Sequence, residues 1–377
     1  MITRIAIILA LLSGIAAPAG AQSFETAARN AIIIDYDTGR ILFEKDPEVP
    51  IPTASMSKMM TVYMLFERLQ SGALSEEDSF TVSERAWRKG GSKMFVEVGS
   101  VVSVHDLLRG IVVQSGNDAC IVVAEGLAGS EDAFAEQATA RARELGLTQT
   151  VLKNSTGWPE EGHQMSVHDL ARLAILTIRN FPEYYPLYAE TSFTFNGIKQ
   201  SNRNPLLYRG IGADGLKTGH TEEAGYGLVA SAVQGDQRLI MVLSGMAGSR
   251  ERADESERVM RWAQRTFATY RLADAGLEIE QADVWLGERP RVPLVAGDDV
   301  VVAMARTDRA RMKAEVVYDG PVPAPVKKGD RLATLVLTVD DARVGEFPLV
   351  AGADVEPLGP LGRIGAVVGQ WIWGTGS

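Results

Sequence analysis

Ser55 and Lys58, in the run PTASMSKMM at residues 52–60, form a Ser-x-x-Lys pattern inside an otherwise apolar, Met-rich stretch. The apolar run predicts a helix from about Met56 to Leu69, and side chains three residues apart lie on one helix face. A buried lysine has a lowered pKa, and its neutral form can act as the base that a serine needs to become a nucleophile. Taken alone, the pattern also fits a surface lysine whose stem covers apolar residues.

Two later triplets favour the catalytic interpretation. Ser115-Gly116-Asn117 is a polar break between two apolar helical segments, so its side chains can project into a cleft. Lys217-Thr218-Gly219 precedes two buried strands, and we expect its glycine to let a substrate lie against the strand edge. The order Ser-x-x-Lys, Ser-x-Asn, Lys-Thr-Gly is typical of penicillin-binding proteins and class A β-lactamases.

The elements that position these residues can be predicted from local patterns. Residues 31–45 indicate a hairpin around an Asp-Thr-Gly turn, and residues 192–204 indicate a second hairpin around Asn196-Gly197. Further predictions are a helix over residues 131–145, two buried strands joined at residues 234–236, and a helix over about residues 255–270. Helices in the middle and strands at both ends predict an α/β sandwich whose mostly antiparallel sheet joins the two ends of residues 22–275.

Two further predicted helices begin with the same tetrapeptide, Ser-Val-His-Asp, at residues 103–106 and 166–169. Serine followed three residues later by an acid is a capping pattern, so we interpret His105 and His168 as structural. After Gly276 short Val-rich runs alternate with Gly, Pro and Asp, which predicts a small all-β domain over residues 276–356.

The two ends of the chain have their own signals. Arg4, the apolar run IAIILALLSGIAA and the small residues at 19–21 predict a signal peptide over residues 1–21, hence export to a bacterial periplasm. Residues 357–377 include a weak apolar face formed by Leu361, Ile364, Val368, Trp371 and Ile372. This face predicts peripheral, reversible binding to a membrane surface, with a frayed terminus as the alternative.

Composition excludes several classes of function. The 377 residues carry 48 acidic and 38 basic side chains without a basic block, which argues against nucleic-acid binding. The single cysteine, Cys120, cannot form an internal disulfide, and its apolar surroundings predict a buried, inert thiol. Four scattered histidines offer no metal-ligand pair, so we expect no metal and no cofactor.

The sequence resembles the low-molecular-mass penicillin-binding proteins that act as D-alanyl-D-alanine carboxypeptidases, the group typified by penicillin-binding protein 5. The likeness runs from about Ala31 to Val350 and includes FTFNGIKQSNRN, DGLKTGHTEEAGY and the β-rich segment. It implies an α/β (α+β) penicillin-binding/β-lactamase-like transpeptidase domain followed by a small all-β domain. It also implies peptidoglycan stem peptides as substrates and β-lactam antibiotics as covalent inhibitors. For the tail, it implies that the membrane surface is the outer face of the inner membrane.

The resemblance also implies roles for individual residues. Ser55 would be the acylated nucleophile, Lys58 its base, and Ser115 a proton relay. Asn117 would anchor the substrate amide, and Lys217 would keep the site positive. The backbone N–H groups of Ser55 and His220 would form the oxyanion hole. Thr218 and Arg252 would face the substrate's terminal carboxylate, and Gly219 would lie in the strand beside it. Arg203 would contribute to the positive field at that carboxylate.

Three alternatives stay open at this stage. A β-lactamase shares the nucleophile, but the stretch NSTGWPEEGHQMS has Glu160 and Glu161 without the Glu-x-x-x-Asn pattern of class A enzymes. A D,D-endopeptidase would cleave cross-links rather than free peptide ends. An inactive scaffold would bind peptidoglycan through the β domain. Arg203 and Arg252 could equally be partners in structural salt bridges, and His220 could matter only through its backbone.

Overall fold

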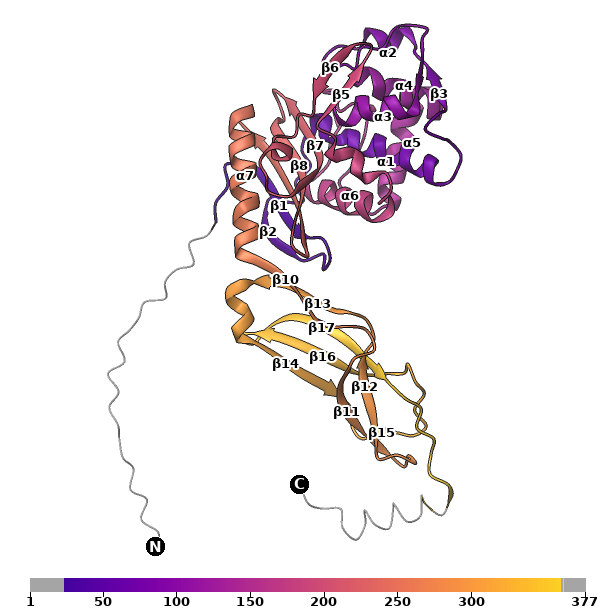
Figure 1. Ribbon diagram of the computed structural model, residues 1–377, viewed down its shortest axis with the longest axis vertical. Helices are drawn as coiled ribbons and strands as arrows, with labels where there is room; N and C mark the ends of the chain where they lie inside the picture. Colours follow the sequence, from indigo (N-terminus) through magenta and orange to yellow (C-terminus); the bar gives the residue numbers. More distant parts are fainter. Residues whose placement is uncertain (1–23, 361, 363–377) are drawn as a thin grey trace, which may run out of the picture.

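A five-stranded antiparallel sheet is the centre of the larger domain (Figure 1). The computed structural model describes residues 24–360 and 362. The strands lie in the order β2 (Ile41–Lys45), β1 (Asn30–Asp35), β9 (Gln237–Met246), β8 (Gly225–Gln234) and β7 (Ala213–Thr221). Strand β1 therefore pairs with both β2 and β9, which brings the two ends of this domain into one sheet as predicted.

Helices cover both faces of this sheet because side chains alternate along each strand. Ile32 and Ile34 of β1 pack into the core of the helical region, whereas Ala31 and Ile33 pack against α7 (Ser249–Thr266) on the opposite face. The helical region consists of η1 (Ala54–Ser57), α1 (Lys58–Gln70), α2 (Glu84–Arg88), α3 (Val104–Val112), α4 (Asn117–Ala128), α5 (Glu131–Glu144), α6 (Val167–Asn180) and η2 (Tyr185–Ala189). The short helix η3 (Pro205–Tyr208) lies on the opposite face, where its Leu206 packs in the same core as α7.

The two predicted helix caps and the two predicted hairpins are confirmed. The Ser103 side chain accepts a hydrogen bond from the backbone N–H of Asp106 at the start of α3, and Ser166 accepts one from Asp169 at the start of α6. The second hairpin consists of β5 (Ser192–Phe195) and β6 (Ile198–Ser201), and a further short pair is β3 (Ser79–Thr81) with β4 (Val101–Ser103).

The helix predicted over residues 255–270 has different ends in the structure. It begins at Ser249 and ends at Thr266, and Phe267–Ala273 forms strand β10, which pairs with β13 (Val300–Ala305). The aromatic and β-branched side chains of residues 267–270 explain the change, because they favour a strand once a partner strand is present. The domain boundary predicted after residue 275 stays a prediction, although β10 before it already pairs with β13 after it.

The C-terminal region is an all-β domain, as predicted. Its larger sheet has the order β14 (Met312–Tyr318), β16 (Arg331–Val339), β17 (Ala342–Ala351), β12 (Arg291–Ala296), β11 (Glu278–Trp285) and β15 (Val322–Pro323), and the helical turn η4 (Arg306–Arg311) precedes β14. Alternate residues of β16, among them Ala333, Leu335 and Leu337, point into one apolar core.

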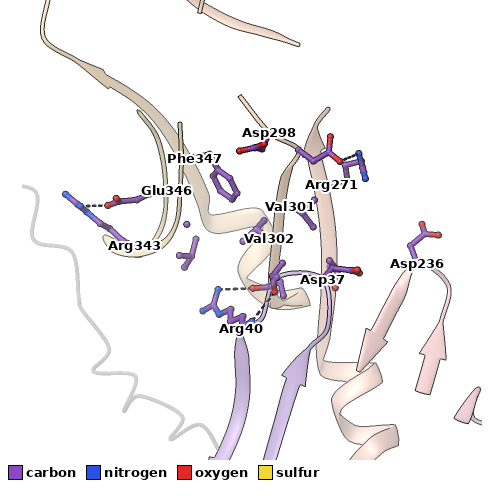
Figure 2. Close-up of a pocket in the computed structure, with 16 residues that line it drawn as sticks. Asp37, Arg40, Asp236, Arg271, Asp298, Val301, Val302, Arg343, Glu346 and Phe347 are labelled. Carbon is purple, nitrogen blue, oxygen red and sulfur yellow. Dashed lines mark hydrogen bonds and ion pairs between the residues drawn. The ribbon is translucent and has the colours of Figure 1, made fainter. Parts of the chain in front are cut away.

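A cleft of about 1200 Å³ lies where the hairpin turn between β1 and β2 meets the C-terminal domain (Figure 2). Arg40 crosses to the C-terminal domain and donates a hydrogen bond to the carbonyl oxygen of Ala303 at 2.8 Å. The buried carboxylate of Asp35 accepts a hydrogen bond from Thr269 of β10. None of the predicted site residues lines this cleft.

Candidate active site

The Ser-x-x-Lys pattern lies at the junction of η1 and α1, with the two side chains in contact. Lys58 is the first residue of α1, and its Nζ lies 2.8 Å from the Oγ of Ser55. Ser55 is partly exposed, whereas Lys58 has no exposed surface at all. The predicted contact is therefore present, and the alternative of a surface lysine is wrong.

Three acceptors surround the amino group of Lys58. Besides Ser55, Nζ contacts Asn117 Oδ1 at 2.7 Å and the carbonyl oxygen of Thr156 at 2.5 Å. The Nδ2 of Asn117 donates to the carbonyl oxygen of Gly90, which keeps Oδ1 turned toward the lysine. A neutral amine has two N–H donors and one lone pair. In that form Lys58 can donate to Asn117 and Thr156 while its lone pair accepts the proton of the Ser55 hydroxyl.

Burial is the main reason why Lys58 can lose its proton near neutral pH. Desolvation disfavours the ammonium form and, with a smaller contribution from the positive charge of Arg203, lowers the pKa of Lys58 to about 8. The neighbouring thiol of Cys120 is buried as predicted, and burial raises its pKa to about 12. Cys120 therefore stays protonated and does not compete for the role of nucleophile.

The second triplet contributes a second hydroxyl–amine pair. Ser115 lies in the short turn between α3 and α4, and its Oγ accepts a hydrogen bond from Lys217 Nζ at 2.9 Å. Lys217 also donates to the carbonyl oxygen of Thr218 and is 3% exposed. Burial, then the nearby charges of Lys58 and Arg203, lower the pKa of Lys217 well below its usual value. The role of Lys217 in keeping the site positive stays a prediction, and the nearby arginines carry permanent positive charge.

Strand β7 is at the edge of its sheet and passes beside the turn that carries Ser55. Gly219 allows this approach, since a Cβ there would lie 2.7 Å from the carbonyl oxygen of Thr53 and 3.2 Å from the nitrogen of Met56. The side of Gly219 on which a Cβ would lie therefore faces the turn of residues 53–56, and the substrate contact at the edge of this strand stays a prediction. His220 is exposed, and its ring stacks on Tyr226 with centroids 3.8 Å apart.

The two predicted arginines lie in different surroundings. Arg203 donates to the Oγ of Ser92, and Arg252 lies over the ring of Tyr226 with an Nε that is buried and has no hydrogen-bond partner. Neither arginine forms an ion pair within residues 24–360 and 362, so the salt-bridge interpretation has no support there. Burial lowers the pKa of both groups, which remain charged because the ordinary pKa of arginine is so high.

The loop of residues 153–163 supplies contacts that sequence reasoning missed. The Oδ1 of Asn154 accepts hydrogen bonds from the N–H groups of Thr156, Gly157 and Trp158, at 3.1, 2.9 and 3.1 Å. These bonds shape the loop so that the Thr156 carbonyl reaches Lys58. The pattern Asn-Ser-Thr-Gly signals a turn that an Asn side chain could organise. No local pattern, however, reveals which carbonyl meets a lysine 98 residues earlier in the chain.

Residues 16–247 match the family model of D-alanyl-D-alanine carboxypeptidase, and residues 267–357 match that of the penicillin-binding protein 5 C-terminal domain. The chain belongs to the D-alanyl-D-alanine carboxypeptidase family. It is 36% identical over 345 residues to the D-alanyl-D-alanine carboxypeptidase DacA of Escherichia coli K12, covering 89% of this chain and 86% of the relative.

Solved structures confirm the predicted fold of the carboxypeptidase. Penicillin-binding protein 5 from Haemophilus influenzae is similar, with a TM-score of 0.81 and 35% identity over 89% of this chain and 100% of that one. Penicillin-binding protein D2 from Listeria monocytogenes, solved in its ampicillin-bound form, has a TM-score of 0.58 and 26% identity over 63% of this chain and 97% of that one. The family makes the protein a serine hydrolase that acts on peptidoglycan peptides.

Neither a metal-binding cluster nor a membrane-spanning helix is present in the part of the carboxypeptidase that the structure describes. Within residues 24–360 and 362, no three His, Cys, Asp or Glu side chains are grouped so that they could hold a metal ion. In the same part of the chain, no helix combines the length and apolar character needed to cross a membrane. The predicted signal peptide lies outside the described residues, as does most of the predicted tail.

Proposed function

We propose that the carboxypeptidase works through an acyl-enzyme on Ser55, with Lys58 as the base. Neutral Lys58 takes the Oγ proton as Oγ attacks the carbonyl carbon of the penultimate D-alanine. The C–N bond then breaks, the terminal D-alanine leaves with a proton on its nitrogen, and water later hydrolyses the ester. The observation that carries this proposal is the 2.8 Å contact between Ser55 and a fully buried lysine.

The other predicted residues fit supporting roles. Ser115, which accepts a hydrogen bond from Lys217, is proposed to pass the proton to the leaving nitrogen. Asn117, whose Oδ1 accepts a hydrogen bond from Lys58, is proposed to contact the substrate amide. The backbone N–H groups of Ser55 and His220 are proposed to stabilise the oxyanion, each by roughly 3 to 4 kcal/mol of barrier. Thr218, Arg252 and Arg203 would face the terminal carboxylate.

The alternatives have less support. Glu160 accepts a hydrogen bond from Asn154 Nδ2 at 3.0 Å, so it serves to hold the loop rather than to activate a deacylating water. This argues against efficient β-lactamase activity and for slow clearance of a penicilloyl ester. Family membership and the intact set of site residues argue against an inactive scaffold. Preference for free peptide ends over cross-links is our proposal, on the strength of the family match.

Release of D-alanine tests the proposed function directly. The mature protein is incubated with a peptide that ends in D-Ala-D-Ala and, in parallel, with a purified cross-linked dimer. We expect stoichiometric D-alanine from the peptide, little cleavage of the dimer, and loss of both activities after treatment with penicillin. Cleavage of the dimer alone would indicate an endopeptidase, and no cleavage of either would support the scaffold.

The lowered pKa of Lys58 predicts how acylation depends on pH. Because the neutral amine is the base, the rate of penicillin acylation should rise with pH and level off above the pKa of about 8. Below that value the rate should fall about tenfold per pH unit, as expected for the titration of one essential base. Stopped-flow or quenched mass measurement across this range checks the profile. A rate that does not change with pH would contradict the role of Lys58.

We further propose that the protein is exported to the periplasm and that its tail binds the membrane surface reversibly. The apolar positions from Leu361 to Ile372 and the two tryptophans support this, but the single cation Arg363 and several glycines keep the expected binding weak. The full mature protein should float with liposomes in part, whereas a form that ends at Glu356 should not. Equal flotation of the two forms would show that the tail is no anchor.

A further inference from the structure

A buried histidine contacts the turn that carries the nucleophile, yet it has no part in the mechanism above. His163 is 5% exposed, and its Nε2 lies 3.0 Å from the Oγ of Ser57. That hydroxyl in turn lies 3.0 Å from the carbonyl oxygen of Ala54, to which it donates. Sequence reasoning gave His163 no role, because it sits in an irregular loop 106 residues after Ser57.

The direction of this hydrogen-bond chain follows from its two ends. The Nδ1 of His163 accepts a hydrogen bond from the backbone N–H of Lys153 at 3.2 Å, so the ring proton is on Nε2. Nε2 therefore donates to Ser57, and the Ser57 hydroxyl uses its own proton for the Ala54 carbonyl. Burial lowers the pKa of His163 to about 4, so the ring is neutral at the pH at which the enzyme works.

The carbonyl at the end of this chain belongs to the same peptide group as the Ser55 N–H. A peptide group is planar, so fixing the direction of the Ala54 C=O also fixes the direction of the Ser55 N–H. Ala54 has a φ of +48°, a conformation that is unfavourable for a residue with a Cβ and needs support from its surroundings. Gly157 packs against the same carbonyl, since a Cβ there would lie 1.9 Å from it.

We propose that His163 is a positioning residue for acylation: through Ser57 it fixes the Ala54–Ser55 peptide plane and aims the Ser55 N–H at the developing oxyanion. The inference rests on the proposed role of Ser55 in the oxyanion site. An interaction of this kind acts on the transition state more than on the bound substrate, so its loss should lower kcat and leave KM nearly unchanged.

The test compares His163→Leu, which keeps an apolar side chain of similar bulk, with His163→Gln, whose amide N–H can reach the position of Nε2. For D-alanine release we expect His163→Leu to lower kcat by about 10- to 100-fold, less than the loss of an entire oxyanion donor, with KM within about twofold. His163→Gln should regain a substantial part of kcat. Penicillin acylation should slow in parallel.

A double-mutant cycle separates positioning from general damage. Ser57→Ala should lower kcat to a similar extent, and His163→Leu/Ser57→Ala should be no worse than Ser57→Ala alone, because both changes break one chain. His168→Leu is the matched control: this histidine pairs with Glu48 at the start of α6, away from Ser55, and should leave kcat unchanged. Thermal unfolding gives the folded fraction of every variant.

Three outcomes would overturn the inference: wild-type kcat in folded His163→Leu, losses from His163→Leu and Ser57→Ala that multiply, or a loss of activity equal to the loss of folded protein. If His163→Leu does not fold, Ser57→Ala and His163→Gln still test the positioning role of His163. Full activity of Ser57→Ala would then count against the proposal. Absence of D-alanine release by the wild type would contradict the proposed function instead.

Discussion

Ser55→Ala should abolish covalent labelling by penicillin. In the proposed mechanism the strained β-lactam amide would react with the activated Ser55 hydroxyl, and water would clear the resulting ester slowly. Intact-mass spectrometry of the wild type should therefore show the mass of one added penicillin, and peptide mapping should place it on Ser55. The variant lacks the only atom that forms this bond in the proposed mechanism, so its mass should stay unchanged even after long incubation.

Ser103→Ala provides the control for this experiment. The Ser103 hydroxyl caps α3 and has no contact with Lys58, so this variant should lose some stability and keep the adduct. An adduct on Ser55→Ala would contradict the assignment. If that adduct mapped to Ser115, the role of nucleophile would pass to the pair formed by Ser115 and Lys217, which are 2.9 Å apart.

Local patterns were enough to predict the parts of the site that depend on short spacing. The contact between Ser55 and Lys58 follows from helical geometry, and the capping serines follow from hydrogen bonds over three residues. The order of the three motifs predicted that Lys217 and Ser115 share a site, although 102 residues separate them. That long-range prediction came from resemblance to a family, and no helix or strand period would have provided it.

Contacts made by backbone atoms could not be predicted, because every residue offers the same carbonyl. The contact of the Thr156 carbonyl with Lys58 depends on how a loop folds back over the turn that carries Ser55. The same limit applies to Gly219. A glycine in a strand indicates that something approaches closely, but the sequence did not reveal that the Thr53 carbonyl lies on the side where a Cβ would be.

The burial of Lys58 is unfavourable for the stability of the fold but favours its proposed role as a base. A lysine with no exposed surface has lost its hydration, and its acceptors, Ser55, Asn117 and the Thr156 carbonyl, are neutral groups rather than a carboxylate. A buried charge without a countercharge is unfavourable for folding, because the hydration it loses is not compensated. The environment that makes Lys58 unfavourable for folding is also the one that lowers its pKa to about 8 and lets it act as a base.

Substitution of Lys58 should therefore separate activity from stability. Lys58→Ala and Lys58→Met should both slow penicillin acylation and D-alanine release by about 10²- to 10⁴-fold, the usual contribution of a general base. Lys58→Met fills the same space and should melt higher than Lys58→Ala, which leaves a cavity; both variants leave Asn117 Oδ1 and the Thr156 carbonyl without their donor. Lys199→Met, an exposed lysine on β6, is the control and should match the wild type in both measurements. Acylation of Lys58→Met at the wild-type rate would show that Ser55 is activated by another group, and loss of folding in Lys58→Met would show that the lysine is needed for structure.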